Sequence, residues 1–207
     1  MKPTLVFNRS KVSAEIGRVA MYQLHGNVAG LIGMLDSDLR ALTSYSIVRG
    51  HAAAALGRLG DPRAIPYLVS MRHDPEVSVR QDVMRALGKL QAREAEGVLL
   101  EALSDPAPLV RMTAASSLAR IGAVNAISAL WKAVDADPDR YLRVEAVEAL
   151  IILGDETARD RVPEALRALS WRARGARWKR LREAADTGDA LTPWELPWDR
   201  EPKRQES

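Results

Sequence analysis

Apolar and polar residues recur along this chain with a period of about 31 residues. In each copy an aliphatic residue precedes an arginine, and a helical spacing of apolar residues follows. The anchor arginines are Arg49, Arg80, Arg111, Arg143 and, in a degraded copy, Arg174, so their spacings are 31, 31, 32 and 31 residues. A fixed period of this length is typical of stacked helical hairpins. The sequence therefore predicts an all-α fold, an α-solenoid of about five hairpins.

Each unit is predicted to contain two helices joined by a turn. In one unit the first helix carries Ala64, Ile65, Leu68 and Met71, which is a helical spacing. Asp-Pro turns follow at residues 74–75, 105–106 and 137–138, where aspartate can cap a helix and proline suits its first turn. The second helix is expected to begin near the anchor arginine and to end at Gly60, Leu90, Gly122 or Gly154, since glycine tolerates the left-handed conformation.

The period divides the chain into three parts. Residues 1–25 are expected to form a leader and a capping helix, residues 26–188 the repeat solenoid, and residues 189–207 an extended tail rich in proline and tryptophan. The segment Asp36–Ser46 makes the first unit about seven residues longer than the period allows. It is either a binding loop or a longer helix.

One stretch of the chain carries a family likeness. Asp61-Pro62-Arg63-Ala64-Ile65-Pro66-Tyr67-Leu68, followed by Asp74-Pro75, Val79-Arg80 and Ala86-Leu87-Gly88, resembles the HEAT-like repeat named after phycobilisome lyases. The resemblance covers roughly residues 26–185. It implies that the anchor arginines form a structural ladder with turn aspartates such as Asp74, Asp105 and Asp137. It leaves the function open, because this repeat occurs in bilin lyases, in a metal-dependent hydroxylase and in scaffolds.

Composition narrows the chemistry. The chain has no cysteine, which excludes disulfides and thiolate metal sites. Its histidines, His25, His51 and His73, are far apart and form none of the His-Glu pairs of the hydroxylase relatives, so no metal or other cofactor is expected. Glycine-rich phosphate loops and a nucleophilic serine elbow are missing as well. Without an apolar run of about 18 residues, a cytoplasmic protein with no membrane contact is expected.

Charges gather on one predicted helix face. Counted from the anchor arginine, positions +3, +4 and +7 are apolar and predicted core, while positions +2, +5 and +9 point away from it. The first three repeats then present a basic stripe, formed by Arg58, Arg85, Lys89 and Arg120 with His51 nearby. The fourth presents an acidic patch, Glu145 and Glu148. This face either attracts a charged partner or is ordinary solvated helix surface.

A second basic patch lies near the C-terminal end. Residues 171–182 include Arg172, Arg177, Lys179 and Arg180, and the tail adds Trp194 and Trp198. Arginine beside tryptophan suits phosphate contact with base stacking, a solvated capping helix, or docking to an acidic protein. The two tail tryptophans are expected either to fold back on the last repeat or to dock on a partner.

The favoured function is a non-catalytic scaffold that binds a partner protein on its concave face, since a repeat solenoid offers a long rigid surface. One alternative is a nucleic-acid-binding solenoid that uses the basic stripe and the 171–182 segment. The other, implied by the resemblance alone, is a bilin-lyase-like enzyme or chromophore chaperone, although the predicted inner face has few aromatic residues to line such a pocket. The sequence does not set the oligomeric state.

Overall fold

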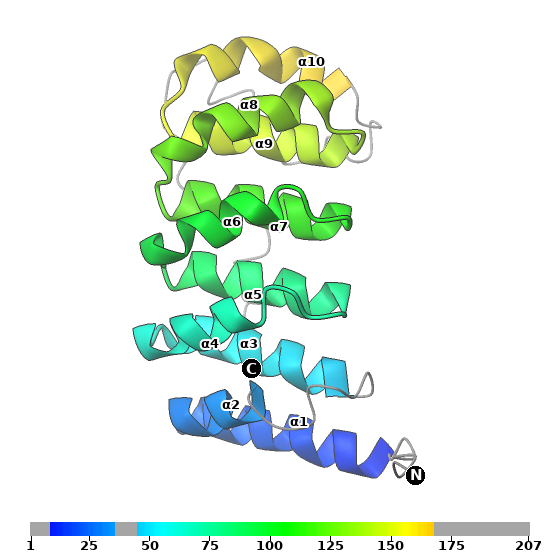
Figure 1. The fold of residues 1–207 in the computed structure, drawn as a ribbon, viewed down its shortest axis with the longest axis vertical. Helices are drawn as coiled ribbons and strands as arrows, with labels where there is room; N and C mark the ends of the chain where they lie inside the picture. Colours follow the sequence, from blue (N-terminus) through cyan, green and yellow to red (C-terminus); the bar gives the residue numbers. More distant parts are fainter. Residues whose placement is uncertain (1–8, 36–44, 168–207) are drawn as a thin grey trace, which may run out of the picture.

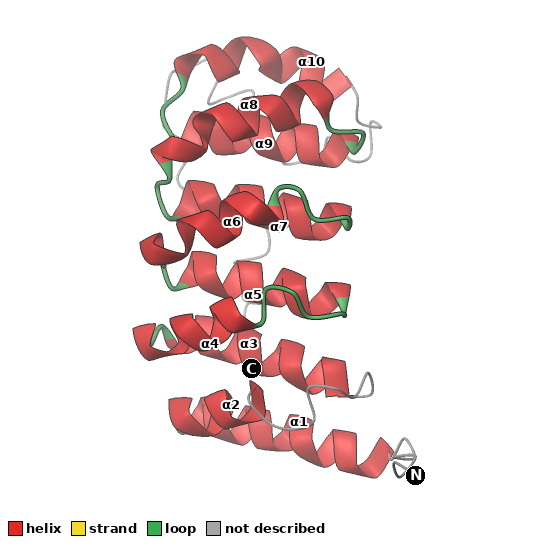
Figure 2. Cartoon of the chain, viewed as in Figure 1, coloured by secondary structure: helices red, strands yellow, loops and turns green. Residues whose placement is uncertain are grey.

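The computed structural model describes residues 9–35 and 45–167, and every regular element within these ranges is helical (Figures 1 and 2). The helices stack along one long axis (Figure 1). The α-helices are α1 (Arg9–Leu24), α2 (Val28–Leu35), α3 (Ser46–Leu59), α4 (Ile65–Ser70), α5 (Val77–Lys89), α6 (Glu96–Ala102), α7 (Pro108–Arg120), α8 (Ile127–Ala136), α9 (Arg140–Ile152) and α10 (Val162–Arg167). Short 3-10 turns precede four of the outer helices, at Pro62–Ala64, Arg93–Ala95, Val124–Ala126 and Glu156–Arg161.

The helices form two rows. In the inner row α3, α5, α7 and α9 each pack on the next, and α1 extends this row by packing on α3. In the outer row α2, α4, α6 and α8 each pack on the inner helix of the same hairpin. The predicted α-solenoid is thus confirmed over four hairpins, and α10 begins a fifth. The predicted tail at 189–207 lies outside the described residues.

The core follows the predicted helix positions. At +3, +4 and +7 from each anchor arginine the side chains of the inner row are fully or almost fully buried: Ala52, Ala53, Leu56; Val83, Met84, Leu87; Ala114, Ala115, Leu118; Ala146, Val147, Leu150. The outer helices supply the facing layer, with Leu68, Leu99 and Leu130 completely buried. Because each hairpin can bury its apolar face only against its neighbours, the stack is the stable arrangement.

The inner helices end as the glycine pattern predicts. Gly60, Gly122 and Gly154 have φ values of 74°, 69° and 85°, in the left-handed region that closes a helix. In the second unit Gln91 takes this place with φ 51°, and it is the one non-glycine residue in the described ranges with a positive φ. A side chain in this conformation costs free energy that glycine avoids.

Small residues bring the inner helices close together. A Cβ built on Gly57 would lie 2.7 Å from the Cα of Ala86, so α3 and α5 meet almost backbone to backbone. A Cβ on Gly88 would lie 2.5 Å from the Oγ of Ser117. That hydroxyl donates a hydrogen bond of 2.9 Å to the Met84 carbonyl, which ties α7 to α5. These contacts hold the neighbouring inner helices at short separations.

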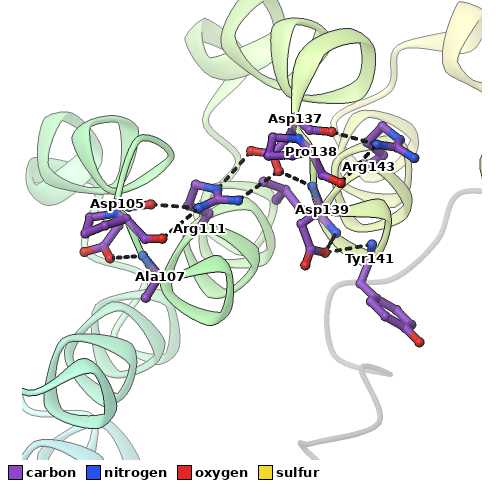
Figure 3. Close-up of polar contacts among 10 residues, drawn as sticks. Asp105, Ala107, Arg111, Asp137, Pro138, Asp139, Tyr141 and Arg143 are labelled. Carbon is purple, nitrogen blue, oxygen red and sulfur yellow. Dashed lines mark hydrogen bonds and ion pairs between the residues drawn. The ribbon is translucent and has the colours of Figure 1, made fainter.

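The anchor arginines form the expected ladder. Arg49 binds both carboxylate oxygens of Asp74, at 2.8 and 3.0 Å, and both side chains are almost completely buried. Arg80 binds Asp105 in the same way, at 2.8 and 2.9 Å. Arg111 binds Asp137 with both distances 2.9 Å (Figure 3). Bidentate pairs of this kind are among the strongest polar contacts in proteins.

A second bond makes the ladder continuous. Arg80 Nη1 donates to the backbone carbonyl of Asp74 at 2.8 Å, and Arg111 Nη1 donates to that of Asp105 at 2.9 Å. Arg143 donates to the carbonyl of Asp137 at 2.7 Å (Figure 3). Arg80 and Arg111 therefore each join their own turn to the next one, and Arg143 holds its own turn. Arg174 lies outside the described residues.

The turn aspartates act differently from the prediction. The inner helices begin at Val77, Pro108 and Arg140, in each case two residues after the proline of the Asp-Pro pair. The prolines of these pairs are therefore not in the first helical turn. Each aspartate instead accepts the backbone N–H two residues on, as Asp105 does from Ala107 at 2.8 Å (Figure 3). The carboxylate thereby shapes the turn and receives the arginine at the same time.

Candidate functional site

One face of the inner row points away from the core and forms the candidate site. Its residues lie at positions −2, +2, +5 and +9 from each anchor arginine, a 4-3-4 spacing that places them on one side of a helix. We call this surface the inner face. Positions +2, +5 and +9 were predicted from the sequence, whereas position −2 was not. It lies four residues before position +2, so the same helical spacing predicts it as well.

Position −2 gives the inner face an apolar edge. Ile47, Leu109 and Tyr141 are 53%, 54% and 39% exposed, and Ser78 holds the equivalent place in α5. They stand at the first turns of α3, α7 and α9. Large apolar side chains that recur at one repeat position mark a surface suited to contact with another protein.

The centre of the inner face holds a polar cluster. Asp82 on α5 makes an ion pair with Arg85 one turn later, and its carboxylate covers the Cα of Gly50 on α3, where a Cβ would meet Oδ2 at 2.8 Å. Burial raises the pKa of the Asp82 carboxyl, because desolvation outweighs the nearby positive charge of Arg85 and the weaker influence of His51 and Arg58. The Arg85 side chain is half-buried and is held on the inner face by its ion pair with Asp82.

A pocket of about 130 Å³ opens beside this cluster, between α5, α7 and α9. Leu109 and Met112 give it an apolar side. Its polar lining is formed by Gln81, Arg85, Thr113, Ser116 and Glu145. Gln81 donates to the Thr113 hydroxyl at 3.3 Å, which links α5 to α7 at the pocket wall. The pocket has the size to receive one side chain of a partner.

The predicted acidic patch is not a solvent-facing surface. Glu145 is only 2% exposed and Glu148 only 1% exposed. Glu145 lines the pocket against α7 and α5, which explains part of its burial. The helical spacing gave the direction of these side chains correctly but not their depth. The expectation of an exposed patch at α9 is therefore wrong. The equivalent positions of α7, Thr113 and Ser116, are buried as well, so at positions +2 and +5 the inner face is open to solvent only on α3 and α5.

Position +9 gives the inner face a basic edge, which we call the basic row: Arg58, Lys89 and Arg120. Arg58 is exposed and donates a 2.6 Å hydrogen bond to the amide oxygen of Gln23, while Lys89 and Arg120 are half-buried. All three stand in the last turn of an inner helix. A cation there also complements the helix dipole, so the row has a modest structural value as well.

The predicted basic stripe is therefore divided between two roles. His51 is exposed, and Arg58, Lys89 and Arg120 form an edge, whereas Arg85 belongs to the central cluster. The remaining predicted site residues lie outside the described residues: Arg172, Arg177, Lys179, Arg180, Trp194 and Trp198. The same holds for residues 36–44 of the insertion.

Neither a metal site nor a membrane-spanning helix is present in the described part of the chain. Residues 9–35 and 45–167 contain no group of three or more histidine, aspartate or glutamate side chains arranged to hold a metal ion. Within the same ranges no helix combines the length and apolar character needed to span a bilayer. These residues form an elongated stack of helices (Figure 1) whose inner face carries both apolar and polar side chains.

Comparison with known proteins agrees with the geometry. Residues 71–151 match the family of HEAT repeats, and residues 48–71 match the PBS lyase HEAT-like repeat. No curated protein matches the chain significantly. Repeats of this class generally mediate protein–protein interaction and are generally non-catalytic, although the PBS lyase HEAT-like repeat also occurs in lyase subunits. These matches confirm the resemblance to HEAT-like repeats of the phycobilisome-lyase type over residues 48–151, from α3 to α9.

Proposed function

We propose that this protein is a non-catalytic scaffold that binds a partner protein on its inner face. One observation carries the proposal: the inner helices are held in register, so the residues at positions −2 and +9 form two rows across three repeats. An apolar edge at Ile47 and Leu109 faces a basic edge at Arg58, Lys89 and Arg120, with a side-chain-sized pocket between them. Large apolar residues together with arginine are typical of interface hot spots.

Rigidity supports the same proposal. The ladder joins the three Asp-Pro turns through Arg80 and Arg111, and the inner helices meet through Gly57 and Gly88, so little of the surface has to be ordered when a partner binds. A surface ordered in advance loses less conformational entropy on association. An elongated solenoid therefore suits a partner that contacts several repeats at once.

Site-specific photocrosslinking tests the proposal. Ser78 lies on the inner face at position −2 of α5, and Ser128 lies on the outer helix α8; both are exposed serines. A benzophenone amino acid at residue 78 of the full-length protein should crosslink a protein in an extract of the source cells, and one at residue 128 should not. Equal crosslinking at both positions, or crosslinking at 128 alone, would contradict a specific inner-face partner.

Charge reversal provides a second arm of this test. Lys89→Glu with Arg120→Glu should abolish the crosslink at residue 78. A matched pair on exposed residues at the outer row, Arg93→Glu with Lys132→Glu, should retain it. Circular dichroism of both variants checks that they remain folded. Loss of the association on nuclease treatment would instead point to the nucleic-acid alternative.

A further inference from the structure

We propose that the basic row recognises an extended acidic segment of the partner protein whose carboxylates recur at every third residue. This inference rests on the proposed function, that the inner face binds a protein, and it adds the chemistry and the spacing of what is bound. Two observations carry it: the charge balance of the inner face, and the close packing of the helices that present it.

The charge balance favours an acidic occupant. On α3, α5 and α7 the inner face carries four permanent cations, Arg58, Arg85, Lys89 and Arg120, and one carboxylate, Asp82, so the formal balance of these three helices is 4 − 1 = +3 with His51 neutral. The two further carboxylates of the inner face, Glu145 and Glu148 on α9, are almost completely buried. Asp82 is engaged with Arg85. The bond that Arg58 makes within the described chain is to a neutral amide, that of Gln23. A surface of one dominant sign attracts a segment of the opposite sign.

The helix packing sets the spacing of the basic row. Packed helices lie roughly 8–10 Å apart, and small side chains at the contact favour the short end of that range. Here the contacts are Gly57 against Ala86 and Gly88 against Ser117. Because Arg58, Lys89 and Arg120 occupy the same position on successive helices, they repeat at this distance across the stack.

An extended segment matches that spacing better than a helix does. A polyproline II chain has three residues per turn and rises about 3.1 Å per residue, so every third side chain points the same way at intervals of about 9 Å. An α-helix repeats a face once per turn, about 5.4 Å, or after two turns, about 10.8 Å, and neither interval equals the helix spacing. Over three inner helices the extended chain stays in register, while a helical one with carboxylates two turns apart overshoots.

The length of the basic row also sets the length of the partner segment that binds it. Position +9 of α9 is Ile152, so the basic row ends after Arg120. Three cations at two equal intervals call for acidic residues at i, i+3 and i+6. A segment of about seven to nine residues is therefore the unit of recognition.

Two peptides of the same composition test this spacing. The full-length protein is titrated with fluorescent peptides of sequence (Glu-Pro-Pro)₃ and Glu₃-Pro₆ at about 50 mM salt, where surface charges are weakly screened. The spaced peptide should bind about tenfold more tightly than the block peptide. Lys89→Gln should weaken binding of the spaced peptide several-fold, and Lys132→Gln on α8 should leave it unchanged.

Defined outcomes overturn the inference. Equal affinity of the two peptides, or tighter binding of a helical peptide with glutamates seven residues apart, excludes the three-residue spacing. Binding of the spaced peptide that Lys89→Gln leaves unchanged excludes the basic row as its site. If either result occurs while residue 78 still crosslinks a partner, the spacing has failed and the scaffold function stands. If crosslinking fails as well, the proposed function itself has failed.

Discussion

The buried ladder should make a large, measurable contribution to stability, and the rung between Arg80 and Asp105 allows it to be isolated. The two side chains are each only 11% exposed and share two hydrogen bonds, of 2.8 and 2.9 Å. Arg80 also holds the Asp74 carbonyl, and Asp105 also holds the Ala107 N–H. We consider Arg80→Met, Asp105→Asn and the double variant as a double-mutant cycle.

The magnitude follows from burial. Removing one partner leaves the other as a largely buried charge with half its bonds, which typically costs about 3–5 kcal/mol. We take about 3 kcal/mol for each single variant, because both groups keep one backbone contact. The coupling energy should be about 2 kcal/mol, the value of a charge-assisted bidentate pair. For a protein of this length, the single variants should lower Tm by roughly 6–12 °C.

Urea unfolding followed by circular dichroism measures the four free energies at pH 7. The pair formed by Arg63 and Asp61 is the control, because its contacts are as short, 2.6 to 3.0 Å, while Arg63 is 77% exposed. That pair should show no resolvable coupling, since solvent screens it. A coupling at the Arg80 rung as small as the control would refute the reasoning, because the ladder would then be an ordinary set of surface ion pairs.

Four further predictions test the packing and the electrostatics. Gln91→Gly should stabilise the protein by about 1 kcal/mol, measured by urea unfolding, by relieving the left-handed backbone; an unchanged or lower stability would contradict that strain. Gly88→Ala should cost about 1 kcal/mol because the new methyl displaces the Ser117 hydroxyl from its buried bond, and a stability equal to or above that of the wild type would exclude the tight contact. Burial acts to raise the pKa of Asp105, but the bonds from Arg80 outweigh it and hold that pKa below its ordinary value. The ionised Asp105 carboxylate therefore stabilises the fold above about pH 4, and this stabilisation is lost as the pH falls through the lowered pKa. In acid unfolding, the stability of Asp105→Asn should accordingly approach that of the wild type. The pKa of Asp82 is raised instead, so its ionised form costs stability at neutral pH, and Asp82→Asn should be at least as stable as the wild type at pH 7; clear destabilisation would show that its pair with Arg85 outweighs desolvation.

Most of the fold could be predicted from the sequence because the same apolar positions and helix-ending residues recur in several repeats. The period of about 31 residues indicated hairpins, and the apolar positions +3, +4 and +7 identified a core that the structure confirms. Glycines such as Gly60 and Gly122 marked the helix ends correctly. The inner helices do begin near the anchor arginine, three residues before it, as predicted. The outer 3-10 turns and the role of Asp-Pro were missed, since an Asp-Pro pair allows both a helix cap and an isolated turn.

The candidate site was less predictable because depth depends on neighbouring elements. Periodicity gives the direction in which a side chain leaves its helix, and Glu145 does leave α9 on the predicted side. It is nevertheless buried, as it lines a pocket formed by residues of α5 and α7 as well. Arg85 was assigned to the same stripe as Lys89, yet Asp82 on the preceding turn engages it. The depth of Glu145 depends on other helices and cannot be read from one helix, whereas the i,i+3 spacing of Asp82 and Arg85 on α5 was a signal for their ion pair that the sequence interpretation did not use.

The same helices carry the arginine ladder and the inner face, so changes that affect the packing of these helices should also affect the binding of a partner. Arg80 and Lys89 lie on the same helix but leave it in different directions. The Arg80 side chain contacts the Asp-Pro turns, and Lys89 belongs to the basic row. The ladder joins successive turns, while glycine contacts set the distance between successive helices. Because the proposed partner is recognised by spacing, anything that widens one interval should reduce selectivity before it reduces affinity. Gly88→Ala widens the interval between α5 and α7, so it should narrow the preference for (Glu-Pro-Pro)₃ over Glu₃-Pro₆ although no cation has changed. An unaltered preference in a folded variant would mean that charge alone, without spacing, governs binding.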